Sequence, residues 1–470
     1  MLSQLARPAQ WALLQAPGCS SQAPPAPCIA LSRPRARRSA LARRGGVCAA
    51  GKSQQPDLPP PDAPPSAVAD WASAQFLEAA RSNLTKACLL LALEEEAAAQ
   101  AAYLDAEGLG PESVAALRGS VGSASTWSLE RIAALAEECT VTFYAKLHDL
   151  GVVDTVLSVA KQVPDSTLLT LHTDLVKSYP TQLITAINHV LYERHGYRRQ
   201  RRHGDPLDTR LSNVLENGNG SPGSLTVLYL ELAARLSLPL QPVALEGGRY
   251  YVLQPADASI HLSAAGERFV IDPYSEGMLL SEAEVKELFE VEGELRPCSN
   301  EVMLAGMLGV LRDAHWCAAV GCPPEPIWAV PINVEVALGE YRDVEVETSS
   351  GEDTEGEYFR VRFTEPDVEA QDSRAQQWWP AQGYNLHRAL AAAHKRSLLL
   401  PGDLNAQLEY ALLLYFDKRY EEAWTETGCV LQAAKAEAAE RVAVPSFDPE
   451  EIQQMEVLWE KIRLQLAFAA

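Results

Sequence analysis

The sequence lacks the long apolar runs that membrane-spanning helices require. None of its 470 residues lies in a stretch that approaches the ~20 consecutive apolar residues of a spanning helix. Cysteine is scarce as well, because the chain has nine, and three of them (Cys19, Cys28 and Cys48) precede residue 51. Nine scattered cysteines do not make a disulfide framework in so long a chain. We therefore predict no membrane span and a reducing compartment.

Acidic residues are absent from the first 50 positions. This segment holds seven arginines, whereas the first carboxylate of the chain is Asp57. A basic, Ser-containing terminus without acidic residues is typical of an organelle transit peptide, and no continuous apolar region of a secretory signal is present. The stretch Val47-Cys48-Ala49-Ala50 is similar to plastid processing sites of green algae. We predict a chloroplast protein, with a mitochondrial address or an unprocessed basic tail as alternatives.

Basic residues are few in the rest of the chain. The whole sequence has a formal net charge of −22, and residues 51–470 have 33 basic against 62 acidic side chains, a charge of −29. This balance argues against a generic nucleic-acid binder. The one basic run contains Arg198, Arg199, Arg201 and Arg202. It is a candidate site for phosphate or an acidic partner, or else a solvated loop.

Composition and periodicity divide the chain into segments of different character. Helical spacing followed by several short β-like runs predicts an α+β fold. An acidic stretch at 344–357 marks a segment that we interpret as a β-containing insertion. The predicted parts are a transit peptide (1–50), a Pro-rich linker (51–68), a helical region (69–195), a core (196–316), the insertion (317–380) and a helical tail (381–470).

Local signals predict the main elements within these parts. Ser128 is the expected N-cap of a helix over 127–148. Helical patterns predict three further helices, and Gly and Pro punctuation bounds several short strands. The expected helices cover 180–193, 222–238 and 281–316, and the expected strands cover 240–245, 249–254 and 268–272.

The tail shows a weak internal repeat. Ala389 and Ala423 are 34 residues apart, at positions where paired helices pack closely, and Pro401 precedes a fresh helix. A period of 34 is that of tetratricopeptide units. We predict tetratricopeptide-like helices over 381–470, with an ordinary helical hairpin as the alternative.

One stretch carries a family resemblance. The segment 205–239, DPLDTRLSNVLENGNGSPGSLTVLYLELAARLSLP, resembles the bacterial SirB1 family, whose core is a transglutaminase-like domain. Downstream, Ile271-Asp272-Pro273-Tyr274 with Gly277 is similar to the Asp-Pro-Phe-x-x-Gly pattern of that family. The resemblance implies a papain-like core followed by tetratricopeptide-like helices, in an organelle-targeted member of algal or plant type. The insertion 317–380 departs from the family pattern.

The resemblance also implies where a Cys-His-Asp catalytic set would lie. In active transglutaminase-like folds the Cys begins a helix, where the helix dipole favours the thiolate, His is the base and Asp orients it. The Cys position falls at Pro222, which suits the first turn of a helix capped by Ser221 but offers no nucleophile. The His position falls at Arg249, so that Asp272 alone remains. We expect this chemistry to be absent, and Asp272 to cap a turn or pair with Arg249.

Two replacement sites are conceivable. Ser224, His261 and Asp272 form a possible Ser/His/Asp set, against the simpler interpretation of a helix serine and a loop histidine. His315, Cys317 and Cys322 lie within eight residues, but structural zinc usually takes four ligands in close pairs, so no metal or other cofactor is predicted. Cys317 and Cys322 are also a candidate redox pair, with free thiols as the default.

These observations lead to two functional hypotheses. The first is a non-catalytic plastid scaffold that binds a protein partner through its helical tail, since the reactive groups are lost while the core-forming residues remain. The second is an amide hydrolase or acyl-transfer enzyme with a relocated nucleophile at Ser224. Fold alone does not decide between them.

Overall fold

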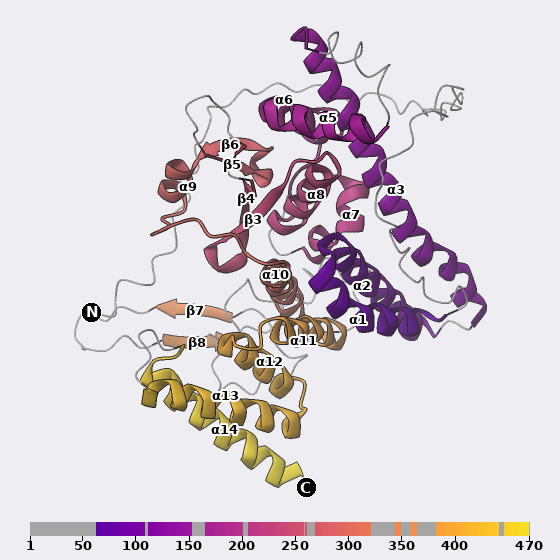
Figure 1. The fold of residues 1–470 in the computed structure, drawn as a ribbon. Helices are drawn as coiled ribbons and strands as arrows, with labels where there is room; N and C mark the ends of the chain where they lie inside the picture. Colours follow the sequence, from indigo (N-terminus) through magenta and orange to yellow (C-terminus); the bar gives the residue numbers. More distant parts are fainter. Residues whose placement is uncertain are drawn as a thin grey trace, which may run out of the picture. The chain divides into compact units, whose positions relative to one another are not determined.

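The computed structural model describes most of the chain after residue 62. The described residues are 63–108, 111–152, 165–200, 205–257, 259–260, 268–320, 344–348, 359–363, 382–440 and 446–469. The predicted transit peptide and residues 51–62 of the predicted linker lie outside them. Helices dominate the described residues, and the largest sheet among them is a small one that lies beside the helices (Figure 1), so the predicted α+β class is confirmed. No helix in these ranges is long and apolar enough to cross a bilayer.

Three helices form the N-terminal region. α1 (Pro65–Ser82) and α2 (Leu84–Glu107) pack together and are separated by Asn83, whose side chain caps α2 by accepting from the Lys86 N–H at 2.9 Å. α3 runs over Pro111–Asp149. The expected helix start at Ser128 is therefore wrong. Ser128 is fully buried within α3, and the helix begins 17 residues earlier at a proline.

Two of the central helices lie close to the predicted ranges 180–193 and 222–238. α5 (Asp165–Ser178) precedes α6 (Pro180–Asn188), which continues as a π-helical turn over His189–Arg194. α7 (Leu211–Asn217) is a two-turn helix that was not among the predicted ones. α8 (Pro222–Arg235) buries its apolar face, which includes Leu225, Leu228 and Leu232, in the main core.

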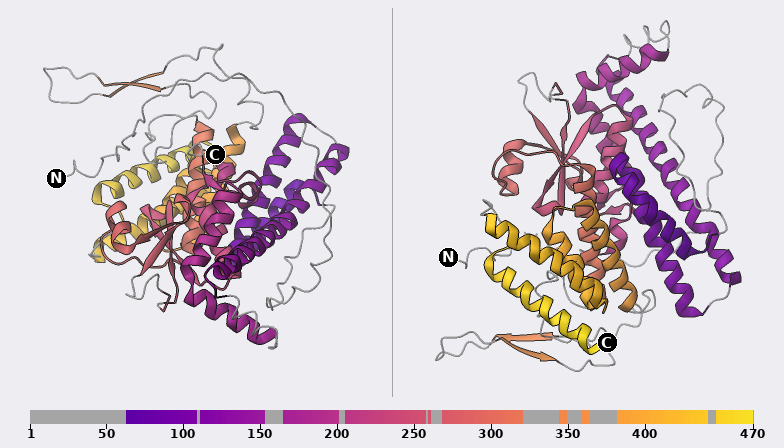
Figure 2. Two further views of the ribbon diagram at one scale, coloured as in Figure 1. Left: turned by 90° about the horizontal axis from the view of Figure 1, so that it is seen from above. Right: turned by 60° about the horizontal axis from the view of Figure 1, so that its bottom comes forward.

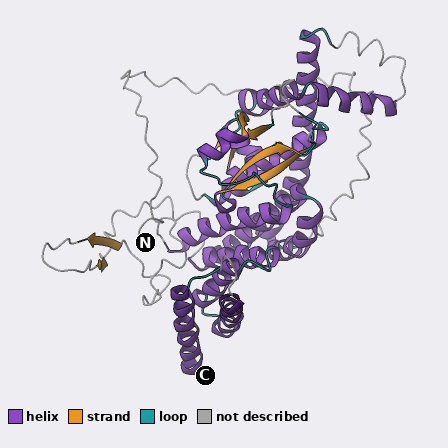
Figure 3. Ribbon diagram, turned by 60° about the vertical axis from the view of Figure 1, so that its left-hand side comes forward, coloured by secondary structure: helices purple, strands orange, loops and turns teal. Residues whose placement is uncertain are grey.

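An antiparallel sheet packs against α8. Its strand order is β3 (Leu240–Leu245), β4 (Tyr250–Pro255), β5 (Phe269–Asp272) and β6 (Met278–Ser281), shown in orange in Figure 3. The first three strands match the predicted ranges within one residue at each end, and β6 was not predicted. Two residues, Arg198–Arg199 (β1), pair in parallel with Asn219–Gly220 (β2) beside the start of α8.

Two helices follow the sheet, so the single helix predicted over 281–316 is wrong, because residues 289–299 are not helical. α9 (Glu282–Leu288) begins with a capping box between Ser281 and Glu284, and α10 covers Asn300–Val320. Within the predicted insertion the structure describes β7 (Val344–Thr348) and β8 (Phe359–Phe363), which pair antiparallel. Residues 321–343, 349–358 and 364–380 of that segment lie outside the described residues.

The tail is helical, as predicted. It comprises α11 (Gln382–Leu399), α12 (Leu404–Phe416), α13 (Tyr420–Glu440) and α14 (Pro449–Ala469), drawn in gold and yellow in Figure 2. Each of these helices packs against the next, and α11 lies along α10. Trp316 and Ala319 of α10 share one apolar cluster with Leu386 and Ala389 of α11. The start of the tail is thus packed on the end of α10.

Candidate functional site

The two serines at the start of α8 are buried and hydrogen-bonded. The Ser221 hydroxyl accepts from the Ser224 N–H at 3.3 Å, and Pro222 occupies the first turn, as the sequence predicted. The Ser224 side chain is fully buried, and its hydroxyl donates to the Asp208 carbonyl oxygen at 2.8 Å. The Gly220 backbone also lies close to this hydroxyl, because a Cβ added at Gly220 would be only 3.0 Å from the Ser224 Oγ. Ser224 is therefore bonded and covered, unlike an accessible nucleophile.

Asp272 ends β5 and has several hydrogen-bond partners. The Tyr250 hydroxyl donates to both of its carboxylate oxygens, at 2.8 Å and 3.0 Å. Oδ1 also accepts from the backbone N–H groups of Tyr274 and Ser275, which caps the short 3₁₀ turn at Pro273–Ser275. The residue is almost fully buried. Asp272 thus caps a turn, as expected, and among the described residues its side-chain donor is a tyrosine.

Arg249 does not pair with Asp272. Its side chain is 68% exposed, and its guanidinium contacts the Asp313 carboxylate of α10 at 3.3 Å. The expected Arg249–Asp272 pair is wrong because Arg249 ends the turn before β4 and its side chain faces solvent, whereas Tyr250, the first residue of the strand, makes the contact with Asp272. Burial, followed by the charge of Asp272, raises the pKa of Tyr250, so this phenol stays a donor at neutral pH.

The basic run is described only in part. Arg201 and Arg202 lie outside the described residues, and so does His261 of the possible Ser/His/Asp set. Arg198 and Arg199 are exposed in β1. Arg199 donates to the Tyr274 carbonyl oxygen at 2.8 Å and to the Ser275 hydroxyl at 2.5 Å, and its guanidinium lies 5.2 Å from the centre of the Tyr274 ring. Arg199 thus donates hydrogen bonds to the same turn that Asp272 caps.

The possible metal cluster is also only partly described. Cys322 lies outside the described ranges. His315 is fully buried, and both of its ring nitrogens are engaged, Nε2 with Glu95 at 3.0 Å and Nδ1 with Asn385 at 3.1 Å. Among the described residues no group of three or more His, Cys, Asp or Glu side chains is arranged to hold a metal ion.

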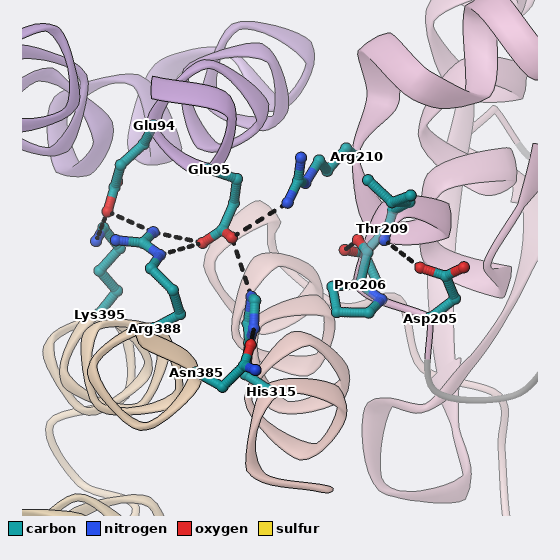
Figure 4. A network of polar contacts seen from close by, with 11 residues as sticks. Glu94, Glu95, Asp205, Pro206, Thr209, Arg210, His315, Asn385, Arg388 and Lys395 are labelled. Carbon is teal, nitrogen blue, oxygen red and sulfur yellow. Dashed lines mark hydrogen bonds and ion pairs between the residues drawn. The ribbon is translucent and has the colours of Figure 1, made fainter. Parts of the chain in front are cut away.

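The structure reveals a buried polar junction that the sequence had not indicated. It joins α2, the residue before α7, α10 and α11, and Figure 4 shows its side chains converging. Glu95 is at its centre. Burial alone would raise the pKa of Glu95, but the charges of Arg388, His315 and Arg210 hold it well below its usual range. We call this set the buried junction, and it comprises Glu94, Glu95, Arg210, His315, Asn385, Arg388 and Lys395.

One sequence signal could have pointed to the buried junction. The run Leu93-Glu94-Glu95-Glu96 interrupts an otherwise apolar helix. Consecutive carboxylates on a helix point in different directions, so at least one of them must face the interior if the helix is packed on several sides. Buried carboxylates need basic partners. Those partners lie as many as 301 positions away, which no local pattern indicates.

Asp208 provides a prediction about pH. Burial, followed by the charge of Asp205, raises the pKa of Asp208 to about 6. The folded state therefore disfavours the ionised carboxylate, and wild-type stability falls as the pH rises from about 4 to about 6. We expect the free energy of unfolding of Asp208→Asn to be about 1–3 kcal/mol higher than that of wild type at pH 7.5. At pH 4 the two proteins should be equally stable. Urea unfolding at both pH values measures this, and an advantage that does not depend on pH would contradict it.

Gly277 provides a prediction about stability. Its φ is +72°, and an added Cβ would lie 2.0 Å from Asn188 Oδ1. Asn188 donates to the Gly277 carbonyl oxygen at 2.8 Å and accepts from the Tyr229 hydroxyl at 2.9 Å, so an alanine would break both bonds. We expect Gly277→Ala to cost about 3 kcal/mol, against about 1 kcal/mol for Gly247→Ala.

Gly247 is a matched control for this substitution. It has a similar φ of +66°, but no atom lies within 4 Å of its added Cβ. Chemical denaturation of both variants separates backbone strain from the clash. Equal losses of stability would show that Asn188 does not constrain this turn.

Comparison with known proteins places a recognisable domain in this part of the chain. The family model described as the transglutaminase-like superfamily matches residues 152–308. The UPF0162 proteins of two Xylella fastidiosa strains, 9a5c and Temecula1, are each 29% identical over 213 residues, which cover 39% of this chain and 73% of each relative. No solved structure matches. The chain therefore contains a transglutaminase-like domain, within which Pro222, Arg249 and Asp272 lie.

Proposed function

We propose that this protein is a non-catalytic, protein-binding member of the SirB1 type, built on its transglutaminase-like domain. The observation that carries the proposal is the set of groups that donate hydrogen bonds to Asp272. In an active domain the equivalent carboxylate would orient a histidine, whereas here Tyr250 and two backbone N–H groups occupy it. Pro222 replaces the nucleophile and cannot ionise. The domain keeps its packing without the groups that would activate a thiol.

The contacts of Arg249, at the expected His position, and of Ser224, the alternative nucleophile, support the same conclusion. Arg249 is directed toward Asp313 on α10 and away from Asp272. The Ser224 hydroxyl donates to a backbone carbonyl oxygen, so its proton is held by a group that cannot act as a base. A relocated serine nucleophile would require both the exposure and the reorientation of this side chain.

The helical tail is the proposed partner-binding surface. Among the described side chains of its last two helices, three large apolar ones are exposed: Trp424 of α13, and Val457 and Leu464 of α14. Val457 and Leu464 are 61% and 52% exposed and lie seven residues apart, so they share one face of α14. Exposed apolar groups on one helix face are a common element of protein interfaces.

A pair of surface variants tests this assignment. In affinity purification of the tagged full-length protein from its organelle, the double variant Val457→Lys/Leu464→Lys should lose partners that wild type retains. Leu288→Lys is the matched control, because Leu288 is also 61% exposed but lies on α9, outside the tail. If the double variant recovers the same partners as wild type, the tail is not the docking surface.

We propose a plastid location on the basis of the acid-free, arginine-bearing first 50 residues. A fluorescent protein fused after residue 68 should enter chloroplasts of a green alga. A mitochondrial or cytosolic signal would overturn this proposal without affecting the assignment of the domain.

A further inference from the structure

The buried junction crosses the edge of the transglutaminase-like domain. Of its members only Arg210 lies within residues 152–308, while the others are on α2, at the end of α10 and on α11. We propose that the junction is an orientation lock that holds the helical tail in one fixed pose on the domain. The tail is then a rigid extension of the core and not a mobile arm. This inference does not depend on whether the domain is catalytic.

The lock has two points of attachment on α11. Arg388 donates to Glu95 at 3.0 Å and to Glu94, also at 3.0 Å. Lys395, two helical turns further along, donates to the same Glu94 oxygen at 2.8 Å. Two attachments along one helix fix both its rotation about its axis and its register against α2.

His315 and Arg210 complete the constraint from two other elements. His315 on α10 connects Glu95 of α2 to Asn385 of α11 through its two ring nitrogens. Arg210, before α7, approaches Glu95 at 3.7 Å from the transglutaminase-like domain. Glu95 therefore has cationic or imidazole partners on three separate elements, and a shift of any one of them would leave a buried charge unpaired.

A second cluster of ion pairs connects α10 and α11 to α12. Arg396 of α11 and Arg312 of α10 both pair with the buried Glu409 of α12. Arg396 follows Lys395 directly, so neighbouring side chains of α11 bind α2 on one side and α12 on the other. Through these contacts α10, α11 and α12 share one ionic framework, to which α13 and α14 are attached by packing on α12 and on each other.

Directional contacts are needed because apolar packing alone does not define a single pose. The Trp316 and Leu386 cluster stabilises contact between α10 and α11 but tolerates sliding of aliphatic surfaces. Buried ion pairs add little net stability, because desolvation offsets the attraction. Every alternative pose that leaves one of them unpaired is strongly disfavoured. The junction thus contributes specificity of docking.

Spin-label distance measurements on the full chain test the lock. One label is placed on the exposed Cys429 of α13 and the other on Leu288→Cys of α9, with the remaining cysteines replaced by alanine. We expect a single narrow distance in this otherwise wild-type background and a broadened distribution in Arg388→Met. Arg419→Met is the matched control, since it removes an exposed arginine paired with Glu422, and it should keep the narrow distance.

A broad distribution before any junction residue is changed, or an equally narrow one in Arg388→Met, would overturn the proposal. Circular dichroism confirms that each variant is folded at the temperature of measurement. If Arg388→Met does not fold, Lys395→Met replaces it, because this substitution removes only the second attachment of α11 to Glu94. It should broaden the distribution in the same direction.

Discussion

Glu95→Gln is expected to lower the free energy of unfolding by about 3–5 kcal/mol, the usual cost of breaking a buried ionic network at one member. Glu95 is fully buried and accepts from Arg388 and His315, with Arg210 nearby. Glutamine keeps the size of the side chain but removes the charge that these groups face. Arg388 keeps Glu94 as a partner, whereas His315 and Arg210 lose the carboxylate that they face, so the loss comes from this unbalanced buried charge and not from a cavity.

The pH dependence of this loss follows from the lowered pKa of Glu95. A carboxyl whose pKa is lower in the folded state contributes stability above its ordinary pKa, and this contribution is lost as the pH falls through the folded value. The difference between wild type and Glu95→Gln should therefore persist from pH 8 down to about pH 5 and shrink only in stronger acid.

An exposed ion pair is the control for Glu95→Gln. Arg419 and Glu422 form a bidentate pair at the surface, with side chains 43% and 52% exposed. We expect Arg419→Ala to cost less than about 1 kcal/mol. Urea unfolding of both variants measures the contrast. Losses of similar size would mean that the buried junction is no more important for stability than a surface pair.

Asp272→Ala is the second substitution with a large expected effect. It would leave the Tyr250 hydroxyl and the N–H groups of Tyr274 and Ser275 without their acceptor in a buried turn. Each unpaired buried donor costs about 1–3 kcal/mol, so we expect a total loss of about 3–5 kcal/mol. Thermal and urea unfolding measure it.

Two milder variants define the origin of that loss. Asp272→Asn keeps a carbonyl oxygen that can accept from the backbone of the turn, and Tyr250→Phe removes only the phenolic donor. Both should lose less stability than Asp272→Ala. If Asp272→Ala is as stable as wild type, the carboxylate does not serve the turn, and a structural role for it is excluded.

Sequence reasoning succeeded where the cause of the structure was local. Ser221 and Pro222 begin α8 as predicted, because capping and the proline preference depend on adjacent residues. The β3 and β4 strands were located because Gly247 and Gly248 separate them. In contrast, Ser128 has the chemistry of a cap but lies inside α3, where packing outweighs local preference.

The candidate site could be predicted only in part. The capping role of Asp272 follows from the Asp-Pro pair at the end of a strand, but its tyrosine partner depends on where β4 begins. Tyr250 begins β4 and Arg249 ends the turn before it, and local patterns do not decide which of two adjacent residues begins a strand. The buried junction was missed because its pairs, such as Glu95 with Arg388, are separated by 293 positions.

The most direct test of the central claim, that the transglutaminase-like domain carries no catalytic nucleophile, is covalent labelling of the full chain. The purified protein is incubated with a fluorophosphonate probe, and its intact mass and modified peptides are measured by mass spectrometry beside Ser224→Ala. The buried, donating hydroxyl of Ser224 predicts no adduct in either protein. A stoichiometric adduct on wild type that is lost in Ser224→Ala would contradict the proposal and establish a relocated active site.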